Sequence, residues 1–256
     1  MPKFDANLTF MFNEFEFLDR FDAAADAGFV GVEYVSPFEH DPDELAGRLA
    51  KNNLSQVLFN MPGGDWGAGE RGIAILPDRV DEFRAGVEKT IKYAKALGCR
   101  RVHCMAGIAP VQLPRETMEQ TFVENLKFAA DRLEKENIRL MIEPKNSIDM
   151  PGYFINHSQS ALELIDKADS NNLFLQYDIY HMQIMEGDLA RTVEANIDRI
   201  GHFQLADNPG RHQPGTGEIN YPFLFEHIDR LGYDGWIGCE YAPSGATIDS
   251  LGWMKA

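Results

Sequence analysis

Short apolar runs alternate along the chain with longer segments that carry apolar residues on one helical face. Runs of this kind are typical of strands buried on both faces, whereas apolar spacings of three and four predict helices. Eight strands are predicted, at 4–10, 31–35, 55–60, 101–107, 139–144, 173–179, 200–207 and 235–241. Helices are predicted at 16–28, 81–98, 116–137, 158–169 and 220–232, and those at 16–28, 81–98 and 220–232 end at glycine.

This alternation predicts parallel strands, because a crossover helix returns the chain to the same end of the sheet. Eight repeats in 256 residues leave room for one strand and one helix each. The chain is therefore predicted to be α/β, one (β/α)8 TIM barrel domain over residues 1–256. The absence of a glycine-rich dinucleotide fingerprint after the first strand disfavours an open nucleotide-binding sheet. After the stretch "CEYAPSG" (239–245) only residues 246–256 remain, so the C-terminal end is expected to be short and irregular.

One segment breaks the repeat. Residues 61–80 carry five glycines and two prolines between the third strand and the next helix. A loop of this length in a compact domain is usually functional or mobile, and it follows a strand's carboxyl end, where barrel sites lie. The segment is predicted to be a lid or substrate loop, with a plain surface excursion as the alternative.

Composition narrows the class of protein. The formal net charge of −16 would repel a phosphate backbone, so nucleic-acid binding is disfavoured. The chain has no run of eighteen consecutive apolar residues, so a transmembrane helix is not predicted. No signal peptide is visible either. The three cysteines have no paired spacing, which is typical of free thiols in a reducing compartment. These features favour a cytoplasmic protein.

Four consecutive predicted strands carry an oxygen-bearing side chain near their carboxyl ends: Glu143, Asp178, Gln204 and Glu240. In a barrel these ends converge on one mouth. Converging buried carboxylates repel each other unless a cation lies among them. Carboxylate and amide oxygens suit Mg²⁺ or Mn²⁺, whereas zinc prefers more nitrogen or sulfur. The alternative for any single residue is a bond to loop backbone.

Asp178 and His181 raise a question of geometry. At a separation of three on an extended strand, their side chains would point to opposite faces. They can serve one site only if the strand ends near Asp178 and the chain then turns inward. Asp178 is therefore interpreted as a ligand at the strand tip, and His181 as a substrate-facing residue on the loop beyond it.

Other polar residues near strand ends are weaker candidates. His103 either points into the mouth or is a satisfied core histidine. Glu33 and Asn60 are predicted to face the mouth, whereas Asn7 could simply bond backbone. His202 lies two residues before Gln204, on the same face of the strand but deeper. It is interpreted as a structural residue or as one that supports the ligand from behind.

Three cations could bind an acidic substrate. Lys145 follows a candidate ligand, Arg71 lies in the glycine-rich loop, and Arg211 lies in the loop after the seventh strand. If the substrate is a carboxylate, one of them should bind it. Glu218 is expected either to bond a neighbouring ligand or to cap the next helix.

Several motifs together resemble the hydroxypyruvate isomerase family. That family belongs to the xylose isomerase-like barrels, alongside ketose 3-epimerases and endonuclease IV. The motifs are "MIEP" (141–144), "YDIYH" (177–181), "HFQLAD" (202–207) followed by "GRHQPGTGEINY" (210–221), "GWIGCEY" (235–241), "ANLTFMFNE" (6–14), "GDWGAGERG" (64–72) and "VHCMAG" (102–107). The resemblance covers almost the whole chain, and the combination is more specific than any one motif.

The resemblance implies the chemistry as well. The superfamily holds its metal with Glu, Asp, His and Glu, and the matching positions here are Glu143, Asp178, Gln204 and Glu240. Glutamine in place of the epimerases' histidine shifts the preference toward Mg²⁺. The two glutamates resemble the acid–base pair, and His181 and Arg211 resemble substrate-binding positions. The implied reaction converts hydroxypyruvate to 2-hydroxy-3-oxopropanoate (tartronate semialdehyde) through a cis-enediolate.

Alternatives within the same chemistry are a 2-oxo- or 3-oxo-tetronate isomerase and a ketose 3-epimerase. The candidate cations favour an acid over a free sugar. A non-catalytic sugar-acid binding barrel is a further alternative, which four intact ligand positions oppose. Endonuclease IV-like action would require more histidine ligands for a trinuclear zinc site and a basic surface, and neither is evident. A dimer or tetramer is a family expectation only.

Overall fold

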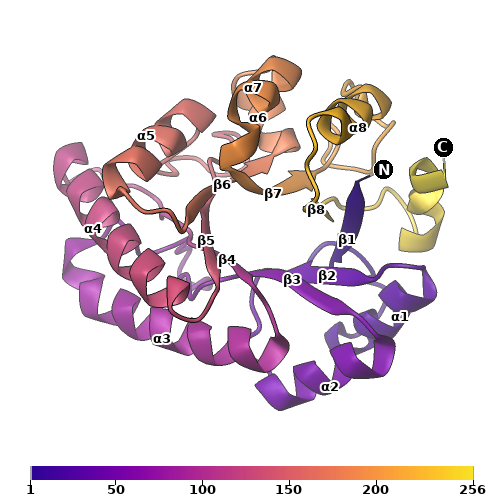
Figure 1. Cartoon of the computed structure of the whole chain (residues 1–256), viewed down its shortest axis with the longest axis horizontal. Coiled ribbons are helices and arrows are strands. Elements are labelled where there is room, and N and C mark those ends of the chain that lie inside the picture. The colour runs from indigo at the N-terminus through magenta and orange to yellow at the C-terminus, as the bar shows by residue number, and fades with distance from the viewer. Residues whose placement is uncertain (1, 256) are drawn as a thin grey trace.

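The computed structural model describes residues 2–255 as eight parallel strands that close into a barrel in sequence order, β1 to β8 (Figure 1). The strands are β1 Lys3–Asn7, β2 Gly31–Tyr34, β3 Ser55–Asn60, β4 Arg101–His103, β5 Arg139–Ile142, β6 Leu173–Asp178, β7 Ile200–Leu205 and β8 Trp236–Cys239. Helices surround the barrel, as the TIM architecture requires. The predicted fold and all eight predicted strands are confirmed.

The α-helices are α1 Arg20–Asp26, α2 Pro42–Asn52, α3 Val80–Leu97, α4 Arg115–Glu134, α5 Ser158–Ala168, α6 Ile179–Met185, α7 Leu189–Asn196 and α8 Tyr221–Arg230. Short 3₁₀ segments are η1 Phe17–Asp19, η2 Pro77–Arg79, η3 Ile197–Arg199 and η4 Thr247–Lys255. The helix predicted at 16–28 is divided between η1 and α1. No helix found among residues 2–255 is long and apolar enough to cross a membrane.

Three helices were not predicted: α2, α6 and α7. The start of α2 had a readable signal, because Asp41 caps the backbone N–H of Asp43 and Pro42 occupies the first turn. By contrast, α6 begins directly at the end of β6, so no polar loop separates strand from helix. The predicted strand at 173–179 therefore contained the first residue of this helix.

The hydrophobic core lies between the barrel and its helices, and it contains the fully buried rings of Phe21, Phe122 and Tyr177. Inside the barrel several side chains are instead polar. Asp5, Glu33 and His202 are fully buried there. Branched apolar residues ordinarily fill this space, so the polar interior sets this barrel apart.

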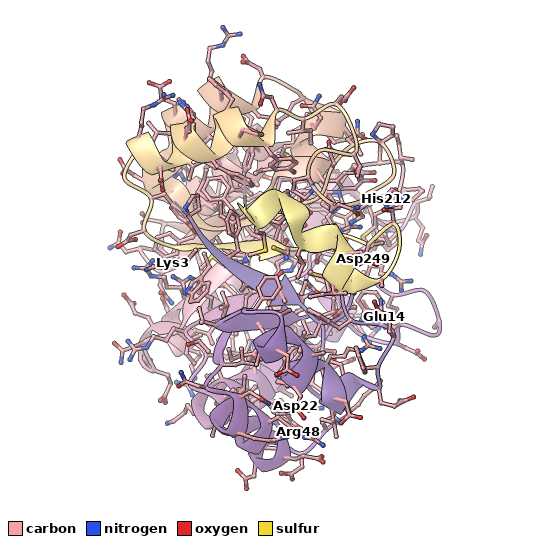
Figure 2. The ribbon with its side chains drawn as sticks, turned by 90° about the vertical axis from the view of Figure 1, so that its right-hand side faces the viewer. Lys3, Glu14, Asp22, Arg48, His212 and Asp249 are labelled. Atoms are coloured by element: carbon pink, nitrogen blue, oxygen red, sulfur yellow. The ribbon has the colours of Figure 1, made fainter. Side chains whose placement is uncertain are left out.

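Pairing of β1 with β8, from Lys3 opposite Trp236 to Ala6 opposite Cys239, closes the barrel. The C-terminal end is short and irregular, as predicted, and it consists of η4. This segment lies beside β1, on the side of the molecule that faces the viewer in Figure 2. The ring of Trp253 packs edge-on against Phe4 at 5.0 Å, and Oγ1 of Thr247 accepts a bond from the backbone of Phe12 at 2.7 Å. These contacts fix η4 across the closure.

Candidate active site

Glu143 directly follows β5 at the carboxyl end of the barrel, and its side chain is buried. Its Oε2 accepts hydrogen bonds from Nζ of Lys145 at 2.6 Å and from Nε2 of Gln176 at 3.0 Å. Its Oε1 is buried without a hydrogen-bond partner among the described residues. One oxygen is thus fixed, and the other is free to face the mouth.

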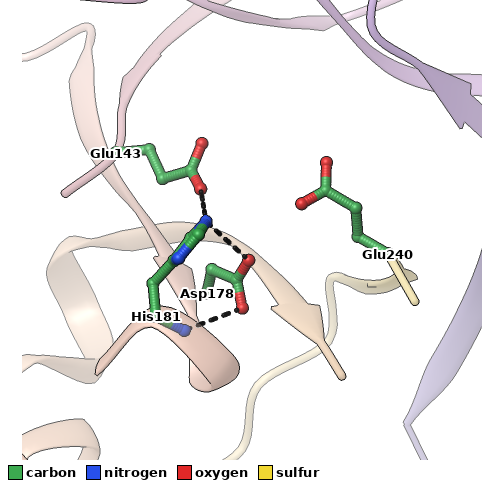
Figure 3. Close-up of side chains that lie close together, drawn as sticks. All are labelled: Glu143, Asp178, His181 and Glu240. Carbon is green, nitrogen blue, oxygen red and sulfur yellow. Dashed lines mark hydrogen bonds and ion pairs between the residues drawn. The ribbon is translucent and has the colours of Figure 1, made fainter. Parts of the chain in front are cut away.

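Asp178 is both the last residue of β6 and the N-cap of α6. Its Oδ1 accepts hydrogen bonds from the backbone N–H of Tyr180 at 2.8 Å and of His181 at 3.4 Å. The helical turn carries the His181 ring back over the strand end, where its Nε2 lies 3.5 Å from Oδ2 of Asp178 and 3.6 Å from Oε1 of Glu143 (Figure 3). The expected inward turn is confirmed, but His181 lies in the first turn of a helix and not on a loop.

The neighbours of His181 fix its tautomer. Its Nδ1 faces the backbone N–H of Asn146 at 3.3 Å and the side-chain nitrogen of the same residue at 2.7 Å. Burial and the nearby charges of Lys145 and Arg211 lower the pKa of His181 well below its usual range, so the ring is neutral. Since Nδ1 meets donors, the proton lies on Nε2, which can donate to an oxygen in the mouth.

Glu240 follows β8 and faces the other three residues across the mouth (Figure 3). Its Oε1 accepts a bond from Nδ2 of Asn7 at 3.2 Å, and its Oε2 accepts one from Arg211 at 2.5 Å. Each of the two glutamates is therefore paired with a positively charged side chain. Lys145 pairs with Glu143 on one side of the mouth, and Arg211 pairs with Glu240 on the other. Such an arrangement can take a proton on one side of a bound substrate and return one on the other.

Gln204, on β7, lies beside these groups with its side chain buried. Its Oε1 accepts a bond from Gln176 at 2.6 Å, and its Nε2 donates to Oε1 of Glu33 at 2.7 Å. In the register of the sheet, Gln204 is paired with Asp178. Nε2 of Gln176 therefore links this amide oxygen to Oε2 of Glu143 through two hydrogen bonds.

The arrangement fits a divalent cation. Glu143, Asp178 and Glu240 each offer a carboxylate oxygen, and these oxygens lie within 4.8 Å of one another and of Nε2 of His181. Oε1 of Glu143 and Oδ2 of Asp178 are buried with no hydrogen-bond partner in the described part of the chain. Orphaned buried donor atoms that face each other call for a ligand, and an oxygen-rich set suits a hard cation.

Electrostatics leads to the same conclusion. Burial raises the pKa of Glu143 to about 8, with the charges of Glu240 and Asp178 adding to the effect and Lys145 opposing it. Burial and the charge of Glu240 likewise raise the pKa of Asp178 to about 7. Carboxylates that gather in this way ionise together only when positive charge joins them.

Arg211 approaches the mouth from the loop between β7 and α8. Its guanidinium lies between the rings of Phe10 and Tyr180, at 4.8 and 5.2 Å from their centroids. Its Nε is buried and has no hydrogen-bond partner among residues 2–255. A substrate oxygen could occupy that donor while the bond to Glu240 persists.

Asp207, which sequence reasoning missed, holds this loop in place. Its two oxygens accept hydrogen bonds from the backbone N–H groups of Asn208, Gly215, Gly217 and Ile219, at 2.8 to 3.1 Å. The only signal in the sequence was an aspartate just before a segment rich in Pro and Gly, which is typical of a turn. The loop that positions Arg211 is therefore built around one buried carboxylate.

His103 and Asn60 lie on the wall of the site next to Glu143. Nδ1 of His103 is 3.1 Å from Oδ1 of Asn60 and 3.6 Å from Oε2 of Glu143. Burial and the charge of Lys145 lower the pKa of His103 well below its usual range, so it is neutral. The histidine thus lies beside Glu143, and its role in binding substrate stays a prediction.

Two predicted site residues lie elsewhere. Arg71 stacks on the Trp66 ring at 4.2 Å and donates to the backbone oxygens of Trp66 and Glu70, so it shapes its own loop. Glu218 is exposed and accepts bonds from Gln183 and Asn208. The described residues that line the central cavity include neither of them. The predictions for Arg71 and Glu218 are not supported by their positions.

A cavity of about 520 Å³ opens above the cluster. Lys145, His181, Arg211 and Glu240 line its floor, and Phe10, Trp66, Met105 and Met150 form an apolar part of its wall. Trp66 belongs to the glycine-rich segment between β3 and α3, so that segment contributes to the wall, in agreement with the predicted substrate loop. The cavity is polar at the reacting end and apolar around it, as small-molecule sites usually are.

Comparisons with known proteins agree with this fold. The family model described as xylose isomerase-like TIM barrel matches residues 21–256. A hydroxypyruvate isomerase of Escherichia coli (strain K12) is 50% identical over 254 residues, with 99% of this chain and 98% of the relative covered. A 2-oxo-tetronate isomerase of Cupriavidus necator is 49% identical over 255 residues, with 100% and 98% covered.

A solved structure from Brucella melitensis, named as an AP endonuclease of family 2, is also similar. It superposes with a TM-score of 0.98 at 49% sequence identity, and the match covers 100% of this chain and 98% of that one. The backbone arrangement of this barrel therefore occurs in a solved relative over its whole length.

Proposed function

The chain belongs to the xylose isomerase-like TIM barrel family and is an isomerase, and we propose that it isomerises a short 2-oxo acid, with hydroxypyruvate as the first candidate. The observation that carries the proposal is the pair of buried glutamates, Glu143 and Glu240, on opposite sides of one cluster of orphaned donor atoms. The product would be 2-hydroxy-3-oxopropanoate. Isomerisation of a 2-oxo-tetronate is the alternative at the same site. Relatives of nearly equal sequence identity are named as hydroxypyruvate isomerase or as 2-oxo-tetronate isomerase.

The cofactor proposed for this site is Mg²⁺, with Mn²⁺ as the alternative. Glu143, Asp178, Gln204 and Glu240 would hold it, and the free oxygens of Glu143 and Asp178 support this assignment. When bound, such a cation polarises a carbonyl and stabilises negative charge on neighbouring oxygens. The proton on Nε2 of His181 makes that nitrogen a donor to substrate and not a metal ligand.

The protein's own groups move the protons. One glutamate removes a proton from the hydroxymethyl carbon, and the electron pair of that C–H bond forms the carbon–carbon double bond of a cis-enediolate. The other glutamate then delivers a proton to the adjacent carbon. Meanwhile the proton of the hydroxymethyl oxygen passes to the former carbonyl oxygen, so atoms and electrons balance. His181 donates to a substrate oxygen, and Nε of Arg211 binds the carboxylate.

Substrate choice is tested with purified, Mg²⁺-loaded protein. Hydroxypyruvate, 2-oxo-tetronate, 3-oxo-tetronate and a ketohexose are supplied separately, and kcat/KM is measured for each. We expect an oxo acid to give the highest value, with hydroxypyruvate first. Turnover of the ketohexose alone would overturn the oxo-acid proposal, and turnover of none would favour a binding barrel.

DNA cleavage is a second candidate because the similar Brucella structure is named as an AP endonuclease. The formal net charge of −16 opposes it, since binding to a phosphate backbone depends on neutralising cations. A duplex with one abasic site, offered to the same preparation, tests this candidate. Strand cleavage that follows the enzyme concentration would support it, and we expect none.

Compartment and assembly are also proposals. All three cysteines are buried and free, which supports a reducing compartment such as the cytoplasm. A dimer or tetramer is proposed on the family resemblance alone, and light scattering of the purified protein measures it.

A further inference from the structure

A second polar layer lies inside the barrel, one step deeper than the candidate site. Asp5 and His202 precede Asn7 and Gln204 by two residues, so each lies on the same strand face but lower in the barrel. Glu33 joins them from β2, and all three deeper side chains are fully buried. The proposed reaction gives none of them a task.

Glu33 is the acceptor on which this layer converges. Its Oε1 accepts bonds from Nδ2 of Asn7 at 2.9 Å and from Nε2 of Gln204 at 2.7 Å. Its Oε2 lies 2.7 Å from Nε2 of His202. The group is therefore a carboxylate fixed by three donors.

Both amides bound by this carboxylate also reach the candidate site. Nδ2 of Asn7 donates a second bond to Glu240, at 3.2 Å. Oε1 of Gln204 accepts from Nε2 of Gln176 at 2.6 Å, and the same nitrogen donates to Glu143 at 3.0 Å. The two proposed acid–base glutamates are thus connected, through amides, to one carboxylate below them.

The chemistry of amides gives this connection a direction. An amide has one donating end and one accepting end, whereas a carboxylate only accepts. Glu33 therefore takes the NH₂ end of Gln204 and leaves its oxygen turned away, toward the site. With the two ends exchanged, an oxygen would face a carboxylate at hydrogen-bond distance, and a nitrogen would face the position of a cation.

The backbone makes room for this carboxylate. A Cβ atom at Gly238 would clash with Oε1 of Glu33, so the carboxylate occupies space that only glycine leaves on β8. The register of β2 against β3 also shifts between Val32 and Glu33. Such irregularities redirect side chains near functional sites.

We propose that Glu33 is a positioning residue, whose carboxylate orients the amides of Gln204 and Asn7 so that Oε1 of Gln204 and the carboxylate of Glu240 face the site. The inference rests on the proposed function, because it takes Gln204 as a cation ligand and Glu240 as an acid–base group. Partners behind a ligand commonly fix its orientation in this way.

The deeper layer does not form a second cation site. Donor atoms of Asp5, Glu33 and His202 also lie within 4.8 Å of one another. However, Glu33 and His202 already bond each other at 2.7 Å, and a cation between them would break that bond. Burial and the charge of Glu33 raise the pKa of Asp5 well above its usual range, so Asp5 is a neutral acid. The layer supports the site above it.

Two variants separate position from charge. Glu33→Gln keeps the length and loses the charge: its oxygen can face the two amides while its NH₂ faces His202, whose proton can move to Nδ1. Glu33→Asp keeps the charge and withdraws the carboxylate by one methylene, out of reach of the amides. Asp5→Asn, in the same layer but without a bond to Gln204, is the matched control.

Mn²⁺ is titrated onto chelator-treated wild type and variants without substrate, and kcat and KM are then measured separately. We expect Glu33→Asp to lower Mn²⁺ affinity about 10- to 100-fold, and kcat by a similar factor, with KM little changed. Glu33→Gln should stay within about tenfold of wild type, and Asp5→Asn should match wild type. Thermal melting confirms that each variant is folded at the assay temperature.

An aspartate variant that binds Mn²⁺ as well as the glutamine variant, or better, would overturn the proposal, as would a wild type that binds no Mn²⁺. If Glu33→Asp does not fold, Gly238→Ala, which displaces the carboxylate with a Cβ atom, replaces it under the same criterion. Loss of Mn²⁺ binding in folded Glu33→Gln would also reject it. Because the titration uses no substrate, it tests Glu33 even if no oxo acid is turned over.

Discussion

Glu143 and Glu240 each have a cation at close range, Lys145 at 2.6 Å and Arg211 at 2.5 Å. The two pairs approach the mouth from opposite sides, so a bound planar substrate would have one carboxylate on each face. In the proposed reaction, a single turnover would protonate one glutamate and deprotonate the other.

Removing either charge should stop the reaction and leave the fold intact. We expect Glu240→Gln and Glu143→Gln to lower kcat about 10²- to 10⁴-fold, because glutamine cannot exchange the proton. Glu163→Gln, on the exposed face of α5, is the matched control and should leave kcat unchanged. Steady-state kinetics with the best oxo acid measures the effect. A near-wild-type rate for Glu240→Gln would remove that residue from the acid–base pair.

The raised pKa of Glu143 links the proposed cation to the stability of the folded chain. Its ordinary pKa of 4.5 rises to about 8 in the folded chain without a cation, so folding favours the protonated form. The stabilising contribution is complete below the ordinary pKa and is lost as the pH rises through about 8. A bound cation should remove this loss, because it favours the carboxylate.

EDTA should therefore inactivate the protein, and Mg²⁺ or Mn²⁺ should restore it. We also expect the difference in Tm between Mg²⁺-loaded and EDTA-treated protein to widen from about pH 5 to about pH 9. Differential scanning fluorimetry at constant ionic strength measures it. Full activity after exhaustive chelation, or a Tm difference independent of pH, would contradict the cation site.

Sequence patterns were most informative for side chains at strand ends. Glu143, Asp178 and Glu240 could be predicted because each interrupts or ends an apolar run, and the structure brings them together. Arg71 was predicted only from its charge and its loop, and it bonds within that loop. The support given by Glu33 was not predicted, because its partners come from distant strands and no local pattern encodes them.

At the scale of elements, the junction of β6 and α6 shows how one residue serves two purposes. Asp178 ends the strand, caps the helix with Oδ1 and leaves Oδ2 toward the mouth. Because Asp178 caps α6 directly, no loop separates the helix from β6. The apolar pattern of the strand therefore runs into that of the helix without a polar segment between them. That is why the sequence predicted a loop at His181 where the structure has a helical turn.

The loop after β7 depends on Asp207 in a testable way. Asp207→Asn replaces an acceptor with an NH₂ group that faces backbone N–H donors, so the loop should shift and carry Arg211 with it. We expect KM for the oxo acid to rise about tenfold or more, together with a lower Tm. Asp131→Asn, exposed on α4, is the control. An unchanged KM would show that the loop does not position Arg211 for binding.

At the scale of the whole molecule, the barrel could be predicted because the strand–helix unit repeats along the sequence. Eight apolar runs with helical segments between them fit few other architectures. The closing contacts carried no such signal. Asn7 and Glu240 are 233 positions apart, and Gln204 and Glu33 are 171 apart. Residue pairs this far apart in the sequence come together only in the closed barrel. They can therefore be identified from the structure but not from local sequence patterns.

The bond from Asn7 to Glu240 also has a consequence for folding kinetics. It joins the first strand to the end of the last, so Glu240 reaches its final position only when the barrel closes. Long-range closure of this kind comes late in folding, after most of the entropy cost of ordering the chain has been met. A cation that needs Glu240 cannot then guide the early steps. We expect Mg²⁺ to slow unfolding in stopped-flow denaturant jumps and to leave the refolding rate nearly unchanged, and faster refolding would place assembly of the site before closure.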